Sequence, residues 1–261
     1  MTRHPLLPDL QRSRAVLVGC DDGVPRQHGG PEKLATELAE ALTLPTTTAA
    51  FDAAHTQVVR SPRDPSELLG AVSAAADTAT DTLLFYFAAR TSPYQPVPGE
   101  ARPGPNRAED VVGSLGEVAR MIGGAQAVRS VVVLDGVGPR LFQEHAPGAF
   151  VLGGSSFGPP DGDQLCPFTP TLVSGLVHGV REGPELLDLL TLRNAVEAHI
   201  DEARYYVEAD WVGGPADLTV RHPLRFRMVA LGANPVFGQA GRRRGGGLLR
   251  DKDAVTEEYD W

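Results

Sequence analysis

Residues 81–91 read DTLLFYFAART, an apolar run closed by an arginine and a threonine. The stretch from Thr82 to Phe87 is apolar at successive rather than alternate positions, the pattern expected when a parallel strand is covered by helices on both faces. Four further short runs, most of them equally apolar, lie at residues 15–18, 57–59, 131–134 and 149–152. The sequence therefore predicts five strands, most of them covered on both faces.

Helix-like segments separate these runs. One begins at Pro31 and repeats leucine and alanine on a single face. A second follows Asp64, an N-cap residue with Glu67 three positions later. A third repeats this device at Asn106 and continues as an apolar stripe to Ile122. Each segment has the start signal and the apolar face of a helix that packs on a sheet.

Strands and helices thus alternate, which favours right-handed crossovers and a mainly parallel sheet between two helical layers, with function at the carboxyl edge of the strands. Later elements are expected as helices at 168–180 and from 191, and as a strand at 224–231. The expected domains are an N-terminal extension (1–12), a main domain (13–238) and a flexible charged tail (239–261). The terminal Trp261 is a candidate anchor.

Composition narrows the class of protein. The 261 residues carry 24 Lys and Arg against 33 Asp and Glu, a formal net charge of −9, which argues against a nucleic-acid partner. Cys20 and Cys166 form no C-x-x-C pair, and the seven histidines lack zinc-ligand spacing, so no metal site is expected. No phosphate-binding glycine motif, signal peptide or membrane-length apolar run is present. The sequence predicts a cytoplasmic protein with no cofactor and no membrane attachment.

Several segments resemble bacterial caspase-like cysteine peptidases. Residues 81–91 are similar to that family's D-T-L-L-x-Y-Y-A-G-H-G strand, and residues 131–140, VVVLDGVGPR, to its V-V-x-L-D-C-C-F-S-G strand and loop. Further similar segments follow in the family's order, at residues 13–19, 149–156, 167–179, 183–196 and 231–238. The resemblance implies a caspase-like three-layer α/β/α sandwich with a mainly parallel central sheet.

The resemblance also implies that both catalytic residues are replaced, because Arg90 stands where the family has its histidine and Val137 where it has its cysteine. Caspase-like chemistry needs a thiolate beside a group that titrates near neutrality. Valine has no nucleophilic atom, and arginine keeps its proton at any working pH. Asp135 is retained, while Gly136 and Gly138 flank the valine in a remodelled, vestigial pocket.

A hydrolase with a relocated nucleophile is the alternative. Cys20 follows the first strand at the expected functional edge, where His28 could approach it, but a free cysteine is more often a small buried hydrophobe. Ser156 lies in a G-x-S-x-G pattern at residues 154–158, yet two prolines follow instead of the helix that a nucleophile elbow requires.

The leading hypothesis is therefore a pseudo-peptidase rather than an enzyme. Such a domain would act as a regulatory or scaffold partner of another protein, such as an active caspase-like homologue or a second copy of itself. Arg90 and Asp135 follow strands that the resemblance places side by side. Their side chains are accordingly expected to pair and fill the vacated site, since a guanidinium binds a carboxylate through two parallel contacts.

Overall fold

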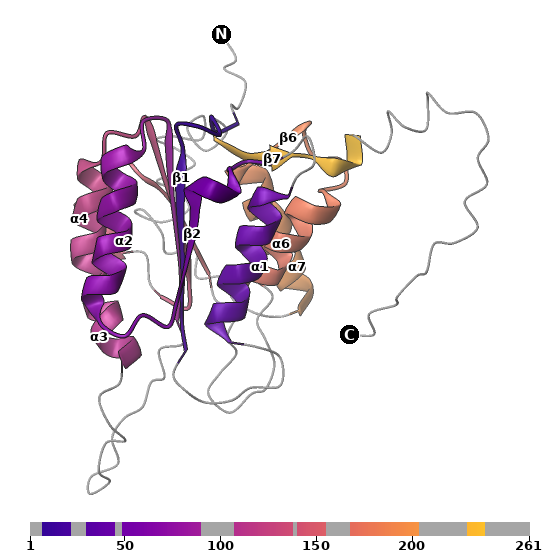
Figure 1. Cartoon of the computed structure of the whole chain (residues 1–261). Coiled ribbons are helices and arrows are strands. Elements are labelled where there is room, and N and C mark those ends of the chain that lie inside the picture. Colours follow the sequence, from indigo (N-terminus) through magenta and orange to yellow (C-terminus); the bar gives the residue numbers. More distant parts are fainter. Residues whose placement is uncertain are drawn as a thin grey trace, which may run out of the picture.

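A computed structural model describes residues 7–21, 30–44, 49–89, 107–137, 140–154, 168–203 and 229–237. Within these ranges, five strands form one parallel sheet in the order β2-β1-β3-β4-β5 (Figure 1). The strands are β1 Arg14–Cys20, β2 Thr56–Arg60, β3 Thr82–Ala89, β4 Arg129–Asp135 and β5 Phe150–Gly154. All five strands predicted from the apolar runs are confirmed.

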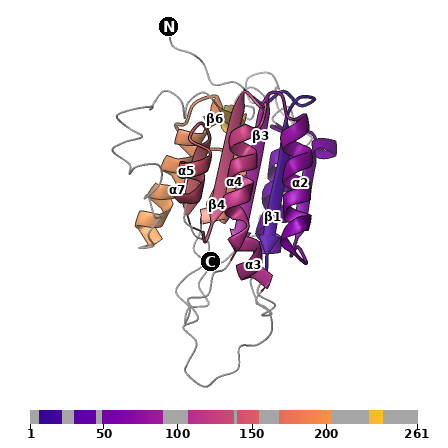
Figure 2. The ribbon, with the colours of Figure 1, turned by 90° about the vertical axis from the view of Figure 1, so that its left-hand side faces the viewer.

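Helices cover both faces of this sheet (Figures 1 and 2). One layer contains α2 and α4, with α5 beside them, and the other contains α1, α6 and α7. The bounds are α1 Pro31–Thr43, α2 Pro65–Thr78, α3 Arg107–Gly113, α4 Leu115–Gly124, α5 Arg140–His145, α6 Phe168–His178 and α7 Leu189–Ala203, with a short 3-10 helix, η1, at Ala53–His55. The chain is an α/β sandwich with a parallel sheet, as predicted.

Two apolar cores result because successive side chains of a strand point to opposite faces. Leu84 and Val133 lie in the core under α1, α6 and α7, whereas Phe85 and Leu134 lie in the core under α2, α4 and α5. All four side chains are at most 2% exposed. Burial on both faces explains why these strands are apolar throughout instead of alternating.

Local signals set the helix starts. The Asp64 carboxylate caps α2 by accepting hydrogen bonds from the backbone N–H groups of Ser66 and Glu67, at 2.8 and 3.3 Å. The hydrogen bond from the Ser66 hydroxyl, together with these two backbone bonds, holds the pKa of Asp64 below its usual value. The Glu67 carboxylate accepts from the N–H of Arg63, one residue before the cap, at 3.0 Å. The predicted start of α2 is confirmed.

The third predicted helix is not continuous. It is interrupted at Ser114, so that α3 ends at Gly113 and α4 begins at Leu115. The Ser114 N–H and hydroxyl both bond the carbonyl oxygen of Val111, at 3.1 and 2.6 Å. A serine that bonds nearby backbone competes with the regular helical pattern, and the preceding glycine has low helix propensity. The apolar stripe is therefore shared between two helices.

The C-terminal elements also differ from expectation. The helix expected from 191 is present as α7 and begins at Leu189, but the short strand β6, Leu186–Asp188, precedes it and was not predicted. This strand pairs antiparallel with β7, Ala230–Ala233, in a separate two-stranded sheet. Helix α7 begins only after Asp188, whose carboxylate accepts from the N–H of Thr191 at 2.7 Å. The strand expected at 224–231 corresponds to β7, which ends at Ala233. Residues 224–228 of the expected strand lie outside the described residues.

Candidate functional site

The carboxyl ends of β3 and β4 bring together the two segments that the resemblance identifies with the catalytic positions. Ala88 near the end of β3 is directly paired with Asp135, the last residue of β4. The chain therefore leaves both strands at the same edge of the sheet. The strand order also reverses beside β3, between β1 and β3, which is where open α/β sheets bind their ligands.

Asp135 lies in the core and is fully buried. The hydroxyl group of Thr169, in the first turn of α6, donates a hydrogen bond to Oδ2 of Asp135. The same Thr169 oxygen lies 2.9 Å from the hydroxyl of Tyr86 on β3. Because the Thr169 hydrogen is directed at the carboxylate, Tyr86 is the donor in the second pair. Tyr86 and Thr169 are also fully buried.

These three side chains form a buried polar network that joins β3, β4 and α6. Burial raises the pKa of Tyr86 well above its usual value, and the negative charge of Asp135 raises it further. The phenol therefore stays neutral and remains a hydrogen-bond donor. The Asp135 carboxylate thereby helps to hold α6 on the sheet.

The residues after Asp135 form a turn that continues this structural role. Gly136 has φ 77°, a left-handed conformation that glycine adopts readily, and its N–H donates to the carbonyl oxygen of Gly154 at 2.8 Å. Val137 is partly buried and packs against the apolar core under α2, α4 and α5. An aliphatic side chain thus occupies the place that the resemblance assigns to the catalytic cysteine.

Several predicted site residues cannot be placed by this geometry. Arg90, Gly138 and Ser156 lie outside the described residues, as do His28 and Cys166. The expected contact between Arg90 and Asp135 and the alternative nucleophile Ser156 therefore both stay predictions.

Cys20 is described, and its surroundings weigh against nucleophilic chemistry. Its side chain is 2% exposed and lies in the core under α2, α4 and α5, on the opposite face of the sheet from Asp135. Burial, reinforced by the negative charges of Asp21 and Glu32, raises the pKa of the thiol to about 12. The reactive thiolate is therefore scarce at neutral pH.

The N-terminus of α1 is also unsuited to bind an anion. In doubly wound folds a phosphate often lies at the first strand-to-helix turn, against the helix N-terminus. Here an oxygen of the Asp21 carboxylate lies so close to Gly30, the N-cap residue, that a Cβ on Gly30 would be 1.9 Å from it. The carboxylate already supplies negative charge where the helix dipole favours it. A phosphate at this position would be repelled.

Sequence reasoning missed Tyr86, Thr169 and Asp21 as members of this edge. A tyrosine within a buried apolar run needs a partner for its hydroxyl, and this signal could have pointed to a polar contact near Asp135. Nothing local identifies Thr169 as that partner, because it lies 83 residues away in sequence.

Comparison with known protein-family models and with curated proteins found no match. In the part of the chain that the structure describes, no three His, Cys, Asp or Glu side chains cluster in a way that could hold a metal ion. Within the same part, no helix has the length and apolar character to cross a membrane.

Proposed function

We propose that this chain is a catalytically inactive caspase-like domain that acts as a regulatory or scaffold partner in a protein complex. The proposal rests on the resemblance of its segments to bacterial caspase-like peptidases, together with an α/β sandwich whose β3 and β4 end side by side. It identifies the carboxyl edge of these strands as a former catalytic site.

One observation supports the loss of catalysis above the others. Val137, at the position of the nucleophile, packs into the apolar core and has no atom that can attack a carbonyl carbon. Next to it, the Asp135 carboxylate accepts a hydrogen bond from Thr169 inside the protein instead of facing a cleft. Both features stabilise the fold. Neither provides a group that could bind the transition state of peptide hydrolysis.

Restoring the family's residues tests this interpretation. The double variant Arg90→His with Val137→Cys supplies an imidazole and a thiol, and the single variant Val137→Cys is its control. We expect the double variant to hydrolyse peptides at the background rate of the control, because the surrounding loop is also remodelled. Efficient cleavage by the double variant alone would show that the rest of the catalytic site is intact, contrary to the proposal.

The proposed partner is a related α/β domain, either an active caspase-like homologue or a second copy of this chain. In the described part of the chain, β2 and β5 are the outermost strands of the five-stranded sheet, and strand edges are surfaces through which sheets associate. Light scattering over a range of concentrations, with the chain alone and mixed with a caspase-like homologue, is expected to show a complex. A strict monomer in both samples would contradict pairing.

A further inference from the structure

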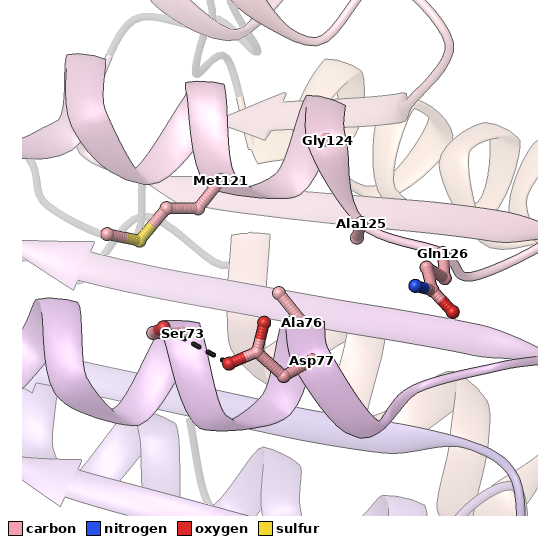
Figure 3. A pocket seen from close by; sticks show the side chains of 7 residues that line it. All are labelled: Ser73, Ala76, Asp77, Met121, Gly124, Ala125 and Gln126. Carbon is pink, nitrogen blue, oxygen red and sulfur yellow. Dashed lines mark hydrogen bonds between the residues drawn. The ribbon is translucent and has the colours of Figure 1, made fainter.

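Helices α2 and α4 lie side by side, and a groove opens between their C-terminal halves (Figure 3). Its volume is about 290 Å³. Because α2 ends just before β3 and α4 just before β4, the groove lies at the amino edge of the sheet. The groove is therefore far from the edge that holds Asp135 and Val137, and the function proposed for that edge does not involve the groove.

The groove combines two sources of negative charge. The exposed Asp77 carboxylate points into the space between the helices (Figure 3), and its bond from the Ser73 hydroxyl, at 3.5 Å, is long. Helix α4 also ends here without a basic residue in its last turn, whereas at the end of α2 the Arg14 guanidinium already donates to the Thr78 hydroxyl at 3.2 Å. Because the last carbonyl groups of a helix lack intrahelical partners and carry partial negative charge, the end of α4 favours a cation.

The remaining lining fits an aliphatic stem that carries the cation. Ala76, Met121 and Ala125 present apolar surface, and methionine adapts its shape to a bound group. The Gln126 amide adds a further acceptor at the end of the groove near the C-terminus of α4. Acceptors distributed over two helices suit a guanidinium, which has five N–H donors in one plane, better than the point charge of an ammonium group.

We infer that this groove binds an arginine side chain of a partner protein, with the guanidinium against Asp77 and the methylene stem along Met121. None of the seven described residues that line the groove is basic. The inference goes beyond the proposed function, because the groove can bind arginine whether or not the carboxyl edge of the sheet is catalytic.

Methionine labelling makes the inference testable on the full chain. The sequence has three methionines, Met1, Met121 and Met228, so carbon-13 methyl labelling gives three signals. Loss of one signal in Met121→Leu assigns the reporter in the groove. Titration with N-acetyl-arginine amide is expected to shift the Met121 signal and to leave the other two in place, and the shift should weaken as ionic strength rises.

Two matched comparisons identify the charge as the cause. N-acetyl-citrulline amide has nearly the same shape without the positive charge and should bind about two- to fivefold more weakly, because an ion pair with an exposed carboxylate is lost. Asp77→Asn should weaken arginine binding by a similar factor. Asp110→Asn removes the same charge from an exposed position on α3 outside the groove and should leave binding unchanged.

Three results would show that the groove does not recognise the charge of an arginine side chain. They are the absence of a Met121 shift at millimolar arginine amide, equal binding of the citrulline amide, and an Asp77→Asn variant that binds as tightly as the unmodified chain. A shift that appears only after Arg242, Arg243 and Arg244 are replaced by glutamine would show that the chain's own arginines occupy the groove. That outcome would overturn the assignment to a partner protein.

Discussion

Replacing Thr169 by valine tests the buried network at the carboxyl edge. The substitution keeps the shape of the side chain but removes the hydroxyl that stands between Tyr86 and Asp135. One lost hydrogen bond is to a neutral phenol and the other is to a carboxylate, and both partners are fully buried. Losing a hydrogen bond costs most when one partner is charged or when the partner stays buried. The expected loss is therefore about 3 kcal/mol of unfolding free energy.

Urea unfolding followed by circular dichroism measures this loss, provided that the dependence of the free energy on urea is unchanged. Thr36→Val is the matched control, because the half-buried Thr36 hydroxyl bonds only the helical carbonyl of Glu32, at 2.8 Å. Its cost should stay below about 1 kcal/mol, since that carbonyl keeps its place in the helix.

A double-mutant cycle then tests whether Tyr86 and Thr169 act together. Tyr86→Phe alone should cost about 1–2 kcal/mol, and the double variant should cost less than the two single variants together by about 0.5–1 kcal/mol. Strictly additive costs would refute the network, as would a Thr169→Val variant that is no less stable than Thr36→Val. Either result would mean that the hydroxyl groups do not bind each other in solution.

Three further predictions concern other parts of the fold. Asp81→Asn should cost about 1–3 kcal/mol near neutral pH because it removes the negative charge that faces the buried Arg129 guanidinium, whose Nη2 lies 2.7 and 2.5 Å from the two Asp81 oxygens. Burial alone would raise the pKa of Asp81, but hydrogen bonds from the Asp9 N–H and from Arg129 outweigh burial and hold the pKa below its usual value of 3.8. The charge of Asp81 therefore stabilises the fold at neutral pH, and this stabilisation is lost as the pH falls through the pKa of the folded protein. Urea melts of the variant and the unmodified chain should converge at that low pH, and a difference that stays constant with pH would contradict the assignment. Cys20, with a thiol pKa of about 12, should resist iodoacetamide at pH 8 in the native chain and react after denaturation, whereas rapid native labelling detected by peptide mass spectrometry would show that it is accessible and ionised. Gly19→Ala should lower the free energy of unfolding by more than about 2 kcal/mol, because the new Cβ would lie 2.4 Å from the carbonyl oxygen of Pro31. Its control is Gly70→Ala on α2, where the Cβ meets open space, and this change should raise the free energy of unfolding by about 0.5–1 kcal/mol. Equal changes in the melting temperature of the two variants would contradict this contrast.

The strands and helix starts were predictable because their causes are local. In the run Thr82–Phe87 every residue after the threonine is aliphatic or aromatic, because both faces of the strand are buried. This burial can therefore be predicted from the sequence itself. The start of α2 depends on Asp64 and the two residues whose N–H groups it accepts. Nothing distant in the chain is needed to form either feature.

Features that depend on distant partners could not be predicted in the same way. β6 has three residues and becomes a strand only through pairing with β7, which lies more than 40 positions later. The interruption at Ser114 is local, but it depends on whether the serine hydroxyl bonds the Val111 carbonyl or solvent. The periodicity of apolar residues does not indicate which of the two partners the hydroxyl bonds.

The candidate site likewise has some features that could be predicted from the sequence and others that depend on distant parts of the chain. The resemblance singles out Asp135 and Val137, and the adjacency of β3 and β4 follows from the fold class. The burial of Asp135 and its contact with Thr169 follow from the position of α6, which the pattern of its own residues does not determine.

The most direct test of the central claim is a hydrolysis assay with a diverse fluorogenic peptide library, run on the purified chain with and without a thiol alkylator. The account predicts no turnover above that of a heat-denatured sample, because Val137 has no nucleophile and Cys20 is buried and protonated. Turnover that is abolished by Cys20→Ala or by Ser156→Ala would contradict it and would show that the chain is a hydrolase with a relocated nucleophile.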